Sequence, residues 1–409
     1  MLQLHGAASE TMTLGINRIF RVSRESNFRN PNACCVVPAV LARFAGLLLF
    51  SAFAWTLTCR PQNLDKPVTT IDEEVTAFSY APDGRIAFSV RRMYKLKKYD
   101  LQRDDIYVLQ PNGKRTRLFN GQKFTLQDKP FTYQVESFTW SPNGHILAVQ
   151  LFTSTADPED GHAEDARALL FVDDNGRTIN AGGKDPLLMN AEIPLWLRDN
   201  ATLVYLSETV APRALFSLQY MNLTTGTAGK AFEGRTFVDA ARIPGSNLSI
   251  AIERDNKFDG PARMQRLELL AQDDKELATL DSFSGQLILS PSGTKAAYFL
   301  DKEILEIRDL TAPDKIARLR VGLGVLQWSA DESRLYLKRT TEKKSGDLVS
   351  FAAPPLVAYR PHQEIPVDQP VPQMLLHGLT VREFGISPDG KFLAVVLPGK
   401  RTLQIFSMN

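Results

Sequence analysis

The chain has 409 residues, enough for one large domain or two ordinary ones, and its 48 Lys and Arg nearly balance 46 Asp and Glu. The resulting net charge of +2 excludes a strong overall attraction to nucleic acid or to anionic lipid. All three cysteines precede residue 60, so the body of the chain uses neither disulfides, nor a thiolate metal site, nor a cysteine nucleophile.

The N-terminal part divides into a basic leader (1–33), an apolar segment (34–59) and a short linker (60–66). We expect the leader to be disordered. The uninterrupted apolar run, Phe44–Thr58, has 15 residues, which suits the core of an export signal better than a full membrane span of about 20. Because basic residues precede it, the positive-inside tendency predicts that the body lies on the extracytoplasmic side, periplasmic or extracellular.

Three fates of this segment stay open. Ala52-Phe53-Ala54 fits a small-residue cleavage site, which would release the body as a secreted protein. Cys59 directly follows the apolar run and resembles a bacterial lipoprotein acylation site, which makes it the lipidation candidate. An uncut signal anchor needs no processing signal at all. In the last two cases, residues 34–59 or a lipid on Cys59 would tether the body to a membrane.

A short turn motif then recurs between apolar runs of about five residues. The clearest copies are Tyr80–Phe88, Trp140–Val149, Leu289–Phe299 and Phe384–Val396. The last contains Ser-Pro-Asp-Gly, in which proline presets its φ angle and glycine accepts the left-handed conformation that closes a tight turn. The pattern of strand, turn and strand therefore predicts a series of β-hairpins.

Three weaker copies bring the number of hairpins to seven: Leu195–Leu206, Ala241–Ile252 and Leu326–Leu337. From Gly84 to Gly390 there are 306 residues in six intervals, an average of 51. Sheet units repeating at about this period are typical of a β-propeller with one four-stranded blade per unit. We therefore predict an all-β fold, a single propeller of seven blades over residues 67–409.

The last predicted blade is incomplete, because only one further strand follows its hairpin. An unpaired sheet edge invites aggregation, and ring closure would remove it. We expect residues 67–72 to pair there as the missing outer strand.

The repeated motif resembles the WD-like repeats with a PD-G signature in the propellers of the periplasmic protein TolB and of prolyl oligopeptidase relatives. Tyr80–Gly84, Trp140–Gly144 and Ser387–Gly390 carry the resemblance. The Trp-Asp dipeptide of true WD repeats is absent, which disfavours that branch. The resemblance implies the fold and is nearly silent about activity.

Catalytic signatures are not found in the sequence. It contains no G-x-S-x-G elbow, P-loop, dinucleotide fingerprint or H-E-x-x-H motif, so we expect no cofactor, no metal and no assembled catalytic group. The alternative is a propeller-type hydrolase or lyase with a metal or charged site in the central channel.

Long connections between second and third strands are expected on one face of the disc, together with the crossings between blades. They are predicted at 91–104, 153–166 and 339–347, and binding residues often lie in such loops. The candidate binding residues on this face are Arg92, Tyr94, Lys97 and Asp160. Neutral surface insertions are the alternative reading, and a nucleic-acid partner is not expected because the basic surface is small.

The innermost strands should line the channel. Counting back from each turn predicts that Glu136, Glu192 and Arg382 gather at its mouth. Two carboxylates and an arginine could bind a ligand, although a satisfied ion-pair cluster is favoured because an unpaired charge is costly there. The sequence thus predicts a non-enzymatic, membrane-tethered extracytoplasmic propeller that binds a protein or peptide through its long-loop face.

Overall fold

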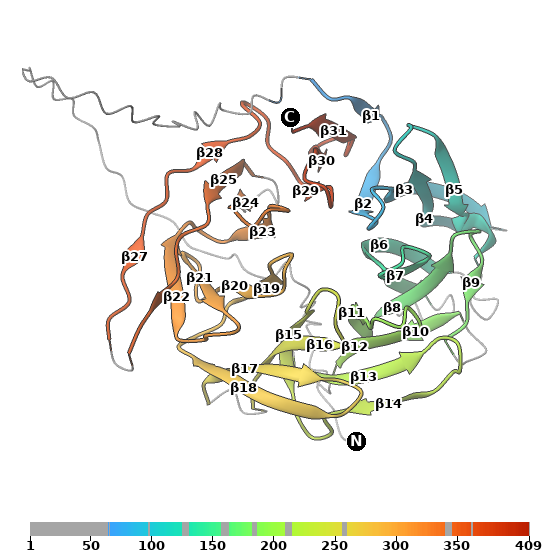
Figure 1. Ribbon diagram of the computed structural model, residues 1–409. Coiled ribbons are helices and arrows are strands. Elements are labelled where there is room, and N and C mark those ends of the chain that lie inside the picture. The colour runs from blue at the N-terminus through green and yellow to red at the C-terminus, as the bar shows by residue number, and fades with distance from the viewer. Residues whose placement is uncertain are drawn as a thin grey trace, which may run out of the picture. The chain divides into compact units, whose positions relative to one another are not determined.

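The computed structural model describes most of the chain after residue 63. The described residues are 64, 66–96, 99–124, 131–156, 163–181, 186–208, 215–255, 260–339, 346–360 and 363–408. Residues 62–409 form one compact unit, in which small antiparallel sheets are arranged in a ring (Figure 1). Among the described residues, no helix is long and apolar enough to cross a membrane.

The described strands group into seven blades, which confirms the predicted all-β propeller. The first three blades contain β2 (Val75–Tyr80), β3 (Ile86–Leu96), β4 (Tyr99–Leu109) and β5 (Arg115–Phe119); β6 (Phe131–Trp140), β7 (Ile146–Ala156), β8 (Ala163–Asp173), β9 (Thr178–Ile179) and β10 (Leu187–Met189); and β11 (Ala191–Trp196), β12 (Thr202–Glu208), β13 (Phe216–Asn222) and β14 (Ala228–Ala231). A single 3-10 turn, η1 (Gly121–Lys123), is described between the first two blades.

The remaining four blades follow the same order from the channel outward. They contain β15 (Phe237–Arg242), β16 (Leu248–Glu253), β17 (Ala262–Glu268) and β18 (Asp273–Leu280); β19 (Gly285–Leu289), β20 (Lys295–Phe299), β21 (Ile304–Asp309) and β22 (Lys315–Arg320); β23 (Gly324–Trp328), β24 (Arg334–Arg339), β25 (Leu348–Ala352) and β28 (Gln373–Met374); and β29 (Glu383–Ile386), β30 (Phe392–Val396), β31 (Leu403–Ser407) and β1 (Thr69–Ile71).

The repeated motif forms the tight turn between the first and second strands of a blade. In the last copy, Gly390 has φ +72° and its N–H donates to the Ser387 carbonyl at 2.9 Å. The Ser387 hydroxyl donates to Asp389 at 2.6 Å and accepts the N–H of Phe392 at 2.9 Å. Serine, aspartate and glycine therefore each have a separate role in fixing the turn, which explains why the motif recurs.

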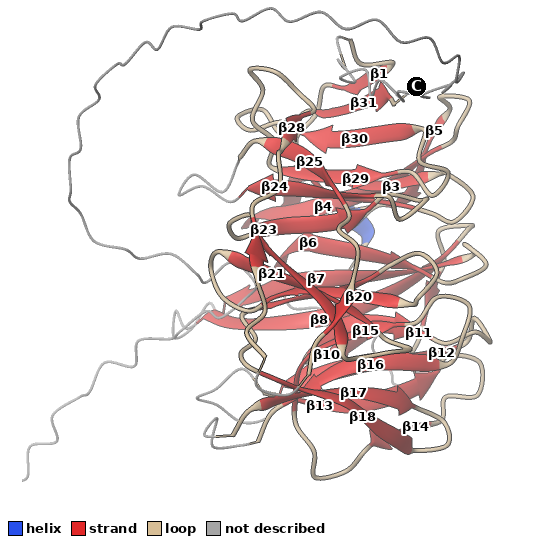
Figure 2. Cartoon of the chain, turned by 60° about the vertical axis from the view of Figure 1, so that its left-hand side comes forward, coloured by secondary structure: helices blue, strands red, loops and turns tan. Residues whose placement is uncertain are grey.

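Neighbouring blades are joined through side chains that reach the backbone of the next inner strand. Gln286 of β19 accepts the N–H of Leu326 in β23, and Gln327 accepts the N–H of Ile386 in β29. Buried apolar side chains fill the space between successive sheets, which are stacked edge-on in Figure 2. The polar links fix the spacing of the inner strands, while the apolar contacts supply most of the stabilisation.

The ring is closed by β1, which pairs antiparallel with β31 and so completes the last blade. Thr69 lies opposite Ile405, and Ile71 lies opposite Leu403 and is 7% exposed. This is the pairing expected from the sequence for residues 67–72.

In two of the three predicted long loops, the described residues are strand. The segment 91–104 belongs to a hairpin in which β3 and β4 pair without interruption from Ile86 opposite Leu109 to Leu96 opposite Tyr99. Residues 153–156 and 163–166 likewise continue β7 and β8, and the residues between them lie outside the described part of the chain. In the first segment, Arg91, Arg92 and Asp104 form ion pairs, so the charges there do not indicate a loop.

Two connections cross the boundaries between blades. β13 and β15 pair through Phe216 and Phe237, which merges the third and fourth blades into one eight-stranded sheet. After β25, the chain passes along the outer edge of the fifth blade, where β26 (Val357–Ala358) and β27 (Val367–Asp368) pair with β22 (Figure 1). It then returns to the sixth blade as β28.

Candidate functional site

One face of the ring carries the connections between second and third strands and the crossings from blade to blade. We call it the long-loop face, and the opposite face, with the Ser-Pro-Asp-Gly turns, the turn face. At the seam between the last and first blades, the connections β1–β2 and β30–β31 meet on the long-loop face. The main candidate site lies at this seam.

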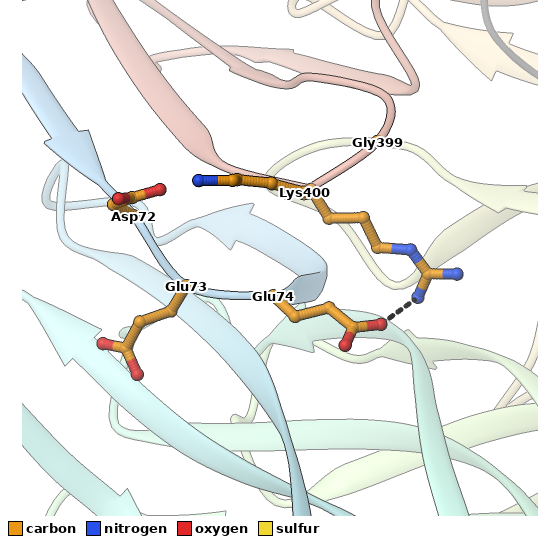
Figure 3. A pocket seen from close by; sticks show the side chains of 6 residues that line it. Asp72, Glu73, Glu74, Gly399 and Lys400 are labelled. Carbon is orange, nitrogen blue, oxygen red and sulfur yellow. Dashed lines mark ion pairs between the residues drawn. The ribbon is translucent and has the colours of Figure 1, made fainter.

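A pocket of about 510 Å³ opens between these two connections (Figure 3). Its lining residues are Asp72, Glu73, Glu74, Gly399, Lys400 and Arg401. The carboxylates come from the β1–β2 connection, and the basic side chains come from the β30–β31 turn. Arg401 reaches across to Glu74, with 3.2 Å between Nη1 and Oε1. The pocket therefore has an acidic wall and a basic wall.

Glu73 forms the base of the acidic wall. Its carboxylate pairs with Arg92 of β3 and with Arg115 of β5. The hydrogen bond from Arg115 is the largest cause that lowers the pKa of Glu73; burial opposes it, and Arg92 adds to it. Arg92, a candidate binding residue, is thus engaged in an ion pair at the rim of the pocket.

Arg91 of β3 lies between two carboxylates, those of Glu74 and Asp104. Arg91 lies 3.5 Å from Glu74 and 3.6 Å from Asp104, which is fully buried. Asp104 also accepts the Thr76 hydroxyl at 2.7 Å and the N–H of Val135 at 2.8 Å. Even so, burial is the dominant effect and raises the pKa of Asp104.

Tyr94 is anchored in the same hairpin and is not a free aromatic platform. Its hydroxyl donates to Asp105 at 2.6 Å, and its pKa is raised by burial first and then by that hydrogen bond. The two remaining candidates on this face, Lys97 and Asp160, lie outside the described residues, as does the lipidation candidate Cys59.

Glu136 and Glu192 are brought together by an arginine that the sequence did not single out. Arg167 of β8 donates to Glu136 at 2.8 Å and to Glu192 at 3.1 Å. Both glutamates lie at irregularities in the strand register, in β6 and β11. A guanidinium between the two carboxylates opposes the binding of a divalent cation there.

Arg382 does not join this group in any described contact. It lies just before β29, where its N–H donates to the carbonyl of Val396 at 2.7 Å and its carbonyl accepts Lys338 at 2.5 Å. Within the described residues, its side chain forms no ion pair, and no three potential ligands among His, Cys, Asp and Glu cluster around a common metal position. Arg382 instead belongs to the seam between the last and first blades.

Comparisons with known proteins were made for the whole chain. No model of a protein family matches it, and no curated protein matches it. Among solved structures, a chain of the "Crystal Structure of Mitotic Checkpoint Complex" matches with a TM-score of 0.53 and 14% identity, over 90% of this chain and 98% of that one. The similarity shows the fold alone. It supports the β-propeller architecture.

Arg167, Arg401 and the Glu73–Glu74 pair were not identified as site residues from the sequence. Arg401 lies far along the chain from Glu74, so only ring closure brings these two together, whereas Arg167 contacts Glu136 in its own blade and Glu192 in the next. The position of Glu73 and Glu74 could have been predicted from the sequence. They directly follow the predicted closing strand, 67–72, and so had to lie at the seam.

Proposed function

We propose that this propeller is a non-enzymatic binding module that takes a protein or peptide partner on its long-loop face. The observation that carries the proposal is the β3–β4 hairpin, which brings exposed side chains to that face from a rigid, fully paired base. Met93 is 65% exposed, and Lys95 beside it is also exposed. An exposed methionine next to a charge is typical of an interface residue that gains contacts on binding.

The resemblance of the repeated turn to TolB-like propellers implies the fold and leaves the role to be argued from the surface. Those motifs build the blades and contribute no catalytic group, so a binding function needs nothing beyond the surface described here. The partner in this proposal is a protein or a peptide and not nucleic acid.

The test is capture of partners by the full chain carrying Met93→Glu and Lys95→Glu. We expect retention of the wild-type partner set to fall by about tenfold or more, because a negative charge would be buried at the contact. The matched control is Lys114→Glu, an exposed residue in the β4–β5 turn on the turn face. Unchanged capture by the hairpin variant, or equal loss in the control, would contradict the proposal.

We also propose that the propeller is held at a membrane on its extracytoplasmic side, through residues 34–59 or a lipid on Cys59. The support is the sequence pattern of basic leader, apolar run and cysteine. Cell fractionation separates the three fates. A lipoprotein leaves the membrane fraction when Cys59→Ser is introduced, a signal anchor stays, and a cleaved export signal yields soluble protein in both cases.

A further inference from the structure

Arg91, Arg382 and Arg401 come from three separate segments and gather at the seam on the long-loop face. The Arg91 N–H donates to the Glu74 carbonyl at 2.9 Å, and the Val75 N–H donates to the Arg401 carbonyl at 3.1 Å. The Arg382 N–H bonds the last carbonyl of β30, the strand that leads into the turn holding Arg401. Backbone hydrogen bonds of the ring thus bring the three segments together, near enough for the charges of Arg382 and Arg91 to act on Arg401.

Two of these guanidinium groups, those of Arg91 and Arg401, are incompletely satisfied within the described residues. Nε and Nη2 of Arg91 and Nη1 of Arg401 are buried and donate no hydrogen bond there. The nearest carboxylate oxygens, on Glu74 and Asp104, lie 3.2 to 3.6 Å away in geometries that are too long or poorly aligned for strong charge-assisted bonds. Oδ1 of Asp104 is likewise buried without a hydrogen bond.

The cluster carries more positive than negative charge. Its basic members are Arg91, Arg382, Arg401 and Lys338, and its carboxylates are Glu74, Asp104 and Glu383. Burial, and then the charges of Arg382 and Arg91, lower the pKa of Arg401. The four positive side chains outnumber the three carboxylates by one, and the positive charges of the arginines repel one another.

The backbone of Arg401 adds an independent observation. Its φ angle is +56°, in the left-handed region that non-glycine residues adopt at a cost of about 1 kcal/mol or more. The neighbouring Gly399 also has a positive φ, so the turn has two residues in this conformation. Strained residues of this kind cluster at binding sites, where the conformation aims a side chain at a ligand.

We propose that Arg91, Arg382 and Arg401 form a binding site for a single carboxylate, carried by a side chain or the C-terminus of a peptide. A planar carboxylate can accept paired hydrogen bonds from guanidinium groups, and one negative charge matches the surplus of one. Of the three arginines, Arg401 lines the pocket, on the side opposite Glu74 (Figure 3). The acidic wall of the pocket disfavours a doubly charged phosphate. The inference names the partner's chemistry and so rests on the proposed function.

The test measures thermal unfolding of the full chain by tryptophan fluorescence, with sodium chloride replaced by sodium acetate at constant ionic strength. Acetate stands in for the partner's carboxylate. We expect a saturable rise of the midpoint by about 1–2 °C in the wild type, because a ligand that binds only the folded state stabilises it. We expect no such rise in Arg401→Gly, whose midpoint without acetate should equal or exceed that of the wild type, since glycine accepts φ +56°.

Gln272→Gly is the matched control, because Gln272 has φ +53° in the β17–β18 turn of another blade and should keep the acetate response. Arg382→Gln is a second variant, which removes an arginine without breaking a described ion pair, and it should lose the response. An equal rise in all variants, or a response to inorganic phosphate and not to acetate, would overturn the proposal. The acetate experiment contains no partner protein. A missing acetate response would therefore count against the carboxylate site alone, whereas unchanged capture by the Met93 and Lys95 variant would count against the proposed function.

Discussion

The carboxylate of Asp239 in β15 accepts the backbone N–H of Leu287 in the next blade at 2.9 Å. A second bond comes from the N–H of Ala240 at 2.8 Å. Burial outweighs both bonds and raises the pKa of Asp239 from 3.8 to about 6. A link between two blades is thus made by a group that titrates in mildly acidic solution.

The raised pKa of Asp239 predicts a pH-dependent stability. The folded state keeps this proton to higher pH than the unfolded state, so the contribution is fully present below about pH 4 and is lost as the pH rises through about 6. Relative to Asp239→Asn, the free energy of unfolding of the wild type should fall by at most about 3 kcal/mol over this window. Urea unfolding at several pH values measures it. Asp100→Asn, at an exposed position, is the control, and a pH-independent difference for Asp239→Asn would contradict the prediction.

Replacing Arg103 by methionine should destabilise the propeller strongly. Arg103 is 1% exposed and donates to the carbonyls of Phe131, Gly121 and Phe124 at 2.7 to 3.1 Å. Methionine would remove these three buried hydrogen bonds, at a cost of about 3 kcal/mol or more in urea unfolding, while the Gly121 carbonyl would keep its bond from the Phe124 N–H. Arg117→Met is the control, since that side chain is 50% exposed and should change stability by less than about 1 kcal/mol. Similar losses in both variants would show that the buried bonds are unimportant.

The Arg167 cluster predicts a rescue. In Arg167→Met, the carboxylates of Glu136 and Glu192 lose the cation between them, and we expect a loss of about 3 kcal/mol in the free energy of unfolding at neutral pH. Adding Glu136→Gln removes one of the two negative charges and should restore a large part of that loss. A double variant no more stable than Arg167→Met would mean that the two carboxylates do not repel each other there.

Closure by β1 can be tested by shortening the chain. We compare residues 62–409 with residues 73–409, which lack β1 and expose the edge of β31. The shorter chain should unfold at lower temperature and self-associate on size-exclusion chromatography, because an open edge pairs with other copies. Ile71→Ala in the longer chain should cost about 3 kcal/mol, as expected for a buried isoleucine. A monomeric shorter chain of equal stability would disprove the role of β1.

Local turn chemistry made most of the fold predictable. Ser387, Asp389 and Gly390 act within a few residues of one another, so their pattern is visible in the sequence. The closing strand was predictable for another reason, because the last unit lacks one strand and only one segment was left to supply it.

The candidate site was less predictable because its contacts are made across the ring. Arg103 and Asp104 lie in a charged stretch typical of a loop, yet both are buried in β4 by partners from other segments. Counting along strands grouped Arg382 with Glu136, but the register is irregular at Glu136 in β6 and next to Glu192 in β11, whereas β29 pairs without an irregularity. β26 and β27 have only two residues each, so no sequence pattern predicts that they pair with β22 of a neighbouring blade.

The closing strand also determines how the propeller would respond to mechanical load. β1 is the outermost strand of the last blade and is held by three residue pairs with β31, while just before it the Val68 N–H donates to Ile405 and Leu64 packs against the core. Tension applied from that end would therefore act first on this ribbon and detach it before any blade with four long strands begins to open. Loss of β1 would leave the edge of β31 unpaired at the seam, near Arg401 and Glu74. Tension and ligand binding would therefore both affect the seam.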